Sequence, residues 1–172
     1  MRYGLCLLKF PMLYALCSML FLVTLGCRGS FLQLKPVLEN EGEVYLYVQP
    51  FPQEAERLRF SIEGISALAV DGREFPLTVS MKDLKCREIK RQRLIAFGPL
   101  PPGPYAGLSF KIKKASLKTE DGEAALLAPD TPVKTDFPFN VARRRGYVIS
   151  MTFRYKESVQ GGFSFSPVFS LS

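Results

Sequence analysis

The amino-acid sequence predicts an all-β protein, an antiparallel β-sandwich of about seven or eight strands that follows an N-terminal export segment. Two observations lead to this prediction. Apolar and polar residues alternate in short runs, and turn residues separate the runs at the spacing of a sandwich. Long helical periodicity is absent. A hydrophobic content of 47% over 172 residues is enough for the core of one domain, which we expect to span residues 43–172.

The clearest strand pattern covers residues 147–155. Ile149, Met151 and Phe153 alternate there with Ser150 and Thr152, so the first three should face a core and the last two should face solvent. Further strands are expected at residues 44–48, 58–70, 74–81, 94–97, 107–117, 122–127 and 137–141, and an aromatic-rich run at residues 163–171 closes the chain.

Turn residues join these runs. Asp71-Gly72 supplies the positive φ angles of a tight hairpin, and Gly64 is expected to mark a bulge or bend. Residues 81–93 are the one stretch whose composition suits a helix, and residues 53–57 suit a single helical turn.

The N-terminus has the pattern of an export signal. Arg2 and Lys9 precede an uncharged apolar run over residues 11–26. This run is shorter than the roughly 20 residues that a membrane-spanning helix needs. We therefore expect residues 1–26 to be removed. The alternative is an uncleaved single-pass anchor that also inserts residues 5–8.

The end of this run, Val23-Thr24-Leu25-Gly26-Cys27, resembles the lipobox of bacterial lipoproteins. In that family the cysteine is acylated, with palmitate among the expected acyl groups, and the chain is cut just before it; Thr24 stands where Leu is usual. The resemblance implies that Cys27 is lipidated, that residues 27–42 form an anchor and tether, and that the protein lies in the bacterial cell envelope. Arg28 replaces the Asp that retains such proteins at the inner membrane, which favours the outer membrane. The alternative is an ordinary signal cut near Gly26 or Gly29.

A second resemblance lies at Leu100-Pro101-Pro102-Gly103-Pro104-Tyr105. This segment is similar to the turn of transthyretin-like β-sandwiches, including carboxypeptidase regulatory-like domains, although Pro104 replaces the usual Thr or Ser. The prolines and Gly103 should set a rigid turn, and Tyr105 should re-enter the core at the start of the next strand. The resemblance implies a sandwich used for structure or binding, usually without catalysis.

The residue inventory excludes several kinds of active site. The chain has no histidine, which excludes Ser-His-Asp and Cys-His catalysis and imidazole metal sites. Phosphate-cradling glycine motifs do not occur. With Cys6 and Cys17 in the signal and Cys27 lipidated, Cys86 has no partner for a disulfide. Lys85 and Arg87 would lower the pKa of its thiol, but a tolerated structural cysteine is the more frequent case.

Paired carboxylates leave one enzymatic alternative, a glycan-active enzyme. Its candidate acids fall in two groups, Glu39, Glu41 and Glu43, and Glu120, Asp121 and Glu123. Both groups lie beside Gly42 or Gly122, where turn chemistry and solubility explain them better. The calcium-loop spacing of acids is missing as well, so we expect no metal, no cofactor and no catalytic residues.

The charge and the aromatic residues point to binding instead. Arg2 and Lys9 leave with the signal, so the 23 basic residues fall to 21 against 16 acidic ones, a net charge of +5. This suits anionic lipids or acidic glycans, and nucleic acid is not expected. The predicted binding surface combines Tyr45 and Tyr47, which share one strand face, with Arg143, Arg144 and Arg145. The basic stretch at Lys82, Lys85, Arg87, Lys90, Arg91 and Arg93 is a further candidate that the arginine run would join in space. The alternative is that this stretch is a solvated connector and that the arginine run is a hairpin turn.

The sequence therefore predicts a membrane-anchored, non-catalytic binding or assembly module of the cell envelope. An envelope protein or a glycan is its expected partner, and the lipid anchor is its expected contact with the membrane. A third alternative is an accessory subunit that becomes ordered within a larger envelope complex.

Overall fold

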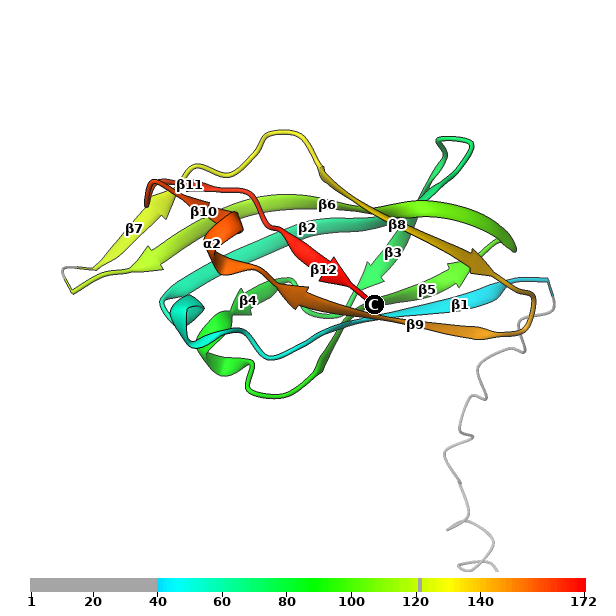
Figure 1. The fold of residues 1–172 in the computed structure, drawn as a ribbon, viewed down its shortest axis with the longest axis horizontal. Coiled ribbons are helices and arrows are strands. Elements are labelled where there is room, and N and C mark those ends of the chain that lie inside the picture. The colour runs from blue at the N-terminus through cyan, green and yellow to red at the C-terminus, as the bar shows by residue number, and fades with distance from the viewer. Residues whose placement is uncertain (1–39, 121) are drawn as a thin grey trace, which may run out of the picture. The chain divides into compact units, whose positions relative to one another are not determined.

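The computed structural model describes residues 40–120 and 122–172, which form a compact β-rich unit (Figure 1). The elements in chain order are β1 (Gly42–Val48), η1 (Gln53–Ala55), β2 (Leu58–Ala69), β3 (Glu74–Val79), β4 (Asp83–Lys85), η2 (Cys86–Glu88), β5 (Arg93–Leu100), β6 (Gly103–Lys118), β7 (Glu123–Leu126), β8 (Val133–Val141), β9 (Gly146–Phe153), α2 (Tyr155–Ser158), β10 (Val159–Gln160), β11 (Ser164–Phe165) and β12 (Phe169–Leu171). The prediction of an all-β protein is confirmed.

The strands form one curled sheet in the order β12-β9-β1-β5-β3-β2-β6-β7, with β4 beside β2 and β8 beside β6. Strand β3 joins the two halves of this sheet, because its first residues pair with β2 and its last two, Thr78 and Val79, pair with β5. The sheet therefore continues through β3, and the two layers expected of a sandwich are not separate sheets. Strands β10 and β11 form a separate small hairpin.

Two details differ from the expected antiparallel arrangement of about seven or eight strands. Strands β1 and β9 pair in parallel, with Leu46 opposite Ile149. The chain between them passes through most of the domain, which satisfies the need of a parallel pair for a long crossover. Twelve strands are assigned among the described residues, and seven of them have six or more residues.

The core lies between the two halves of the curled sheet and is rich in phenylalanine. Phe60 of β2 stacks on Phe153 of β9, with ring centroids 5.9 Å apart, and Phe110 of β6 contacts Phe169 of β12 at 5.2 Å. The predicted faces of β9 are confirmed, since Ile149, Met151 and Phe153 are buried and Thr152 is exposed. Core packing thus accounts for most of the phenylalanines among the described residues.

Three local predictions about turns and bulges are confirmed. Asp71-Gly72 forms the β2–β3 hairpin turn, where Gly72 has a φ of 87° and donates its N–H to the Ala69 carbonyl. The register between β2 and β6 shifts on both sides of Ile62, next to Gly64, as expected for a bulge. Residues 53–57 contain the expected helical turn, η1.

The prediction of a helix within residues 81–93 is wrong. That stretch contains β4 and η2 instead, because Leu84 and Cys86 point into the core at strand spacing and β4 pairs with β2. The single α-helical turn of the described residues, α2, begins at Tyr155, where the sequence pattern had predicted strand.

The proposed signal, lipobox and most of the tether, residues 1–39, lie outside the described residues, as does Asp121. No helix in the described ranges has the length and apolar character that crossing a membrane would require.

Candidate binding surface

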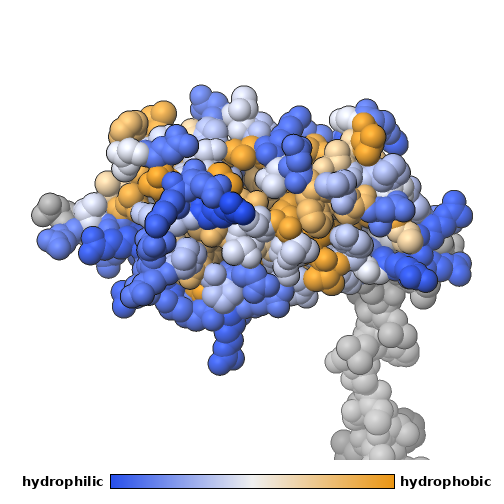
Figure 2. Space-filling view, viewed as in Figure 1, coloured by the Kyte–Doolittle hydropathy of each residue, from blue (hydrophilic) through white to orange (hydrophobic). Residues whose placement is uncertain are grey.

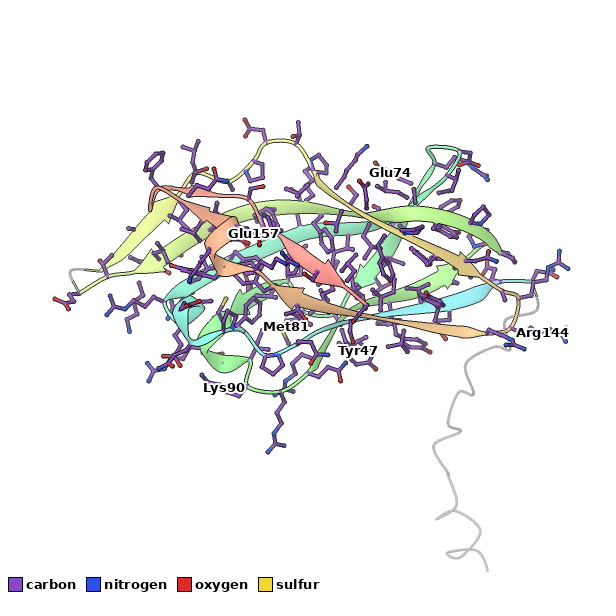
Figure 3. All side chains as sticks on the ribbon, in the orientation of Figure 1. Tyr47, Glu74, Met81, Lys90, Arg144 and Glu157 are labelled. Atoms are coloured by element: carbon purple, nitrogen blue, oxygen red, sulfur yellow. The ribbon has the colours of Figure 1, made fainter. Side chains whose placement is uncertain are left out.

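Tyr45 and Tyr47 lie on the outer face of β1. Val44, Leu46 and Val48 of the same strand are completely buried, so alternation turns the two tyrosines away from the core. Both tyrosines are half-buried. Figure 3 shows Tyr47 projecting from the sheet on the side away from the packed interior. The face predicted from the sequence is therefore accessible.

Apolar residues of the neighbouring strands extend this face. Tyr45 lies opposite Phe97 of β5 and Val148 of β9, and Tyr47 lies opposite Leu94 of β5. Val148 is 59% exposed, and Phe97 and Leu94 are half-buried. A row of apolar and aromatic side chains thus crosses three adjacent strands. We call Tyr45, Tyr47, Leu94, Phe97 and Val148 the β1 face.

The arginine run forms the turn between β8 and β9 and is fastened to the start of β1. The Arg144 N–H donates a hydrogen bond to the Glu41 carbonyl, and the Glu43 N–H donates one to the Arg145 carbonyl, each at 2.9 Å. Arg144 has a φ of 57°, a left-handed turn conformation. All three arginines are exposed.

The β1 face and the arginine turn are contiguous. A Cβ atom placed on Gly146 would lie 3.6 Å from a ring carbon of Tyr45, so this ring lies next to the residue that follows Arg145. The Tyr45 hydroxyl donates a 2.5 Å hydrogen bond to Glu43, which orients the ring. The structure therefore brings the two parts of the predicted binding surface together.

Polar side chains border the other end of the β1 face. Ser150 of β9 lies opposite Tyr47, and its hydroxyl accepts hydrogen bonds from the side-chain amides of Gln49 and Gln92, each at 3.3 Å. An apolar centre between an arginine end and an amide end can contact a partner with both polar and apolar groups.

Cys86 differs from the expectation drawn from its neighbours. Its side chain is buried in the core, and burial raises the pKa of the thiol from 9.0 to about 12. Lys85 and Arg87 are exposed, so they point away from the sulfur and do not lower its pKa. The thiol is therefore neutral at physiological pH, as a structural cysteine should be.

The candidate carboxylates occupy different settings. Glu43 is a buried residue of β1, and Glu41 is exposed. Glu123 is exposed, accepts a hydrogen bond from Ser116 and lies 3.5 Å from Arg59. Within the described part of the chain, no three His, Cys, Asp or Glu side chains gather as metal ligands would.

The basic stretch does not join the arginine turn. Lys90 and Arg144 lie toward different ends of the molecule (Figure 3). Lys85 and Arg87 instead line a groove with Arg57, Arg59 and Lys118. Sequence reasoning missed these partners, because only the pairing of β2 with β4 and β6 brings them together.

Comparisons of this chain with protein-family models, with curated proteins and with solved structures give no match.

Proposed function

We propose that the protein is a lipid-anchored, non-catalytic binding or assembly module of the bacterial cell envelope, and that the β1 face together with the arginine turn contacts its partner. The anchor is an acyl lipid such as palmitate on Cys27, after removal of residues 1–26, and the outer membrane is the favoured location. The lipobox-like residues 23–27 support this part of the proposal. The partner is an envelope protein or a glycan.

The observation that carries the proposal is the continuity between the β1 face and the arginine turn. Aromatic residues and arginine are enriched where proteins contact partners, because they combine a large contact area with directional polar groups. Here two tyrosines and three arginines are accessible on one continuous surface, with the Tyr45 ring beside Gly146. The exposed Val148 lies within the same surface.

The proposed fold is a transthyretin-like sandwich whose two layers are joined through β3. Two features of the residue 100–105 turn support it. Gly103 has a φ of 146°, and Tyr105 enters the core at the start of β6 with only 3% of its surface exposed. A rigid domain of this kind can present a binding face without a catalytic cleft.

Co-purification tests the proposed function. The full chain is extracted from membranes with a non-ionic detergent, and the proteins and glycans that accompany it are identified. The same extraction is carried out with a Tyr45→Ser/Tyr47→Ser double variant and with Phe163→Ser. Phe163 is a matched control because it is 69% exposed and lies in the turn between β10 and β11.

We expect a protein or glycan that accompanies the native chain and the Phe163→Ser chain but is lost from the double variant. Recovery that does not differ among the three chains would contradict the assignment of the β1 face. Hydrolysis of a recovered glycan by the purified native chain would contradict the non-catalytic part of the proposal.

A further inference from the structure

Two adjoining grooves lie on the part of the sheet where β2 pairs with β4 and β6. Their volumes are ≈ 660 Å³ and ≈ 480 Å³, and both are lined by Arg59 and Lys85. Arg57, Arg87 and Lys118 line the larger groove, and Lys114 lines the smaller one. We call the pair the basic groove. Each of the two volumes falls within the range of ligand sites, roughly 300–1,000 Å³.

Strand pairing explains why these cations converge. Arg59 of β2 lies opposite Lys85 of β4 on one side and opposite Ser116 of β6 on the other. Directly opposed residues point to the same face of a sheet, so their side chains stand together. The Lys118 N–H donates a 2.8 Å hydrogen bond to the Arg57 carbonyl, which brings Arg57 to the same place.

The net charge of the mature chain is concentrated in and beside the basic groove. Its lining holds six basic and five acidic residues. The segment 82–93, which contributes to this lining, has four further basic residues outside it, Lys82, Lys90, Arg91 and Arg93, so lining and segment together hold ten basic and five acidic residues. Among the other residues from 27 to 172, eleven basic and eleven acidic residues balance. The net charge of +5 therefore equals that of the groove lining and the adjoining 82–93 segment taken together. Figure 2 shows hydrophilic residues over the lower left of the molecule, where β4 lies.

Part of this charge is not neutralised by ion pairs. Arg59 lies 3.5 Å from Glu123, Lys85 lies 3.2 Å from Glu88, and at the rim Lys90 lies 2.9 Å from Glu56. Six lining residues make no ion pair with any described residue: the cations Arg57, Arg87, Lys114 and Lys118, and the acids Asp83 and Glu120. Pairs this exposed exchange readily for another anion.

The smaller groove lies beside an unsatisfied hydroxyl. Ser61 is two residues from Arg59 on β2 and is paired with Asp83 and Lys114, which both line this groove. It is buried, and its Oγ has no hydrogen-bond partner among the described residues. A ligand oxygen that entered between Asp83 and Lys114 would supply the missing partner.

We propose that the basic groove binds a phosphate group. Three arginines line it, and a guanidinium offers two parallel N–H donors that match two phosphate oxygens. The lining of the larger groove is mostly charged, which disfavours an apolar ligand there. The phosphate belongs either to a soluble phosphorylated molecule or to the headgroup of an anionic phospholipid. This inference is independent of the β1 face and goes beyond the proposed function.

Phosphorus NMR of the full chain in neutral detergent micelles tests the inference. One arm titrates inorganic pyrophosphate, and the other dopes the micelles with phosphatidylglycerol. Each arm compares the native chain with Arg57→Gln/Arg87→Gln and with Arg73→Gln/Lys134→Gln. The second variant removes the same charge from exposed positions that belong neither to the basic groove nor to the proposed binding surface, and it is therefore the control.

Binding to the basic groove should broaden and shift the phosphorus signal with the native chain. The groove variant should weaken this binding about tenfold or more, and the control variant less than about twofold. An effect on pyrophosphate alone identifies a soluble phosphorylated ligand, and an effect on phosphatidylglycerol alone identifies a headgroup. Absence of any effect, or equal loss in both variants, would overturn the proposal.

A second groove variant, Lys114→Gln/Lys118→Gln, tests the proposal independently in case the first variant misfolds. Circular dichroism checks the fold of each chain. Since all four substituted groove residues are exposed, we expect native spectra. A folded second variant that binds pyrophosphate and phosphatidylglycerol like the native chain would also overturn the proposal. The β1-face variant Tyr45→Ser/Tyr47→Ser should keep phosphate binding, which separates this inference from the proposed function.

Discussion

The hydroxyl of Tyr105 donates a 2.9 Å hydrogen bond to the carbonyl oxygen of Pro101. This bond spans the turn between β5 and β6, while the ring of Tyr105 stacks on Phe139 of β8 with centroids 5.0 Å apart. One side chain thus fixes the turn and also packs the core. Burial raises the pKa of its hydroxyl, which keeps the group protonated and able to donate.

Replacing Tyr105 by Phe should therefore remove the hydrogen bond and keep the stacked ring. The expected loss in free energy of unfolding is about 0.5–1.5 kcal/mol, measured by urea denaturation. Tyr147→Phe is the matched control, because Tyr147 also stacks on Phe139, at 5.4 Å, and its hydroxyl donates no hydrogen bond to a described residue. Equal losses in the two variants would mean that the Pro101 contact contributes nothing to stability.

Phe153 lies at the centre of the phenylalanine cluster. Its ring contacts Phe51, Phe60, Phe165 and Phe169, with centroids 5.0–6.5 Å apart. Phe153→Ala should lower the free energy of unfolding by about 3–5 kcal/mol, since a large buried ring leaves a cavity that the sheet cannot close. Phe163→Ala, at a mostly exposed ring, should cost less than about 1 kcal/mol. A cost below about 1 kcal/mol for Phe153→Ala would contradict its place in the core.

The buried face of β9 could be predicted from the sequence because alternation reports directly on which side chains share a face. Ile149, Met151 and Phe153 are buried as expected. The parallel pairing of β1 with β9 could not be predicted, since it joins segments about 100 residues apart and leaves no local pattern. The double pairing of β3 also depends on long-range register.

The candidate sites also differ in whether the sequence alone could predict them. The position of Tyr45 and Tyr47 follows from alternation within one strand. Arg57 and Arg59 converge with Lys85 because β2 pairs with β4, and no local sequence motif predicts this pairing. For Cys86 the sequence neighbours suggested a lowered thiol pKa, because Lys85 and Arg87 are basic. The pKa is raised instead, because the spatial neighbours of Cys86 are apolar.

Cys27→Ser should abolish lipid labelling, because acyl transfer requires the cysteine sulfur. We expect the native chain to incorporate a labelled palmitate analogue and to fractionate with membranes, and the variant to lack the label and to leave the membrane fraction. Cys86→Ser controls for labelling at another thiol and should keep both properties. A variant that stays in membranes as an uncut precursor would instead favour the single-pass anchor.

The thiol of Cys86 should be unreactive in the folded protein. Its pKa is raised to about 12 by burial, so the reactive thiolate is scarce and the sulfur is inaccessible. Iodoacetamide at pH 8 should leave Cys86 unmodified in the folded chain and modify it fully in denaturant, as measured by peptide mass spectrometry. Rapid modification of the folded chain would contradict the buried position.

The same shift predicts how stability depends on pH. The unfolded thiol loses its proton near pH 9.0, whereas the folded thiol keeps it until about pH 12. Between these values the unfolded state binds fewer protons, so the free energy of unfolding should fall as pH rises from 9 toward 12. Below pH 9 the thiol is protonated in both states, so it does not make the free energy of unfolding depend on pH there. Cys86→Ala removes the titrating group and should show a shallower decline over this window. An identical decline in the native and variant chains would assign the alkaline sensitivity to other groups.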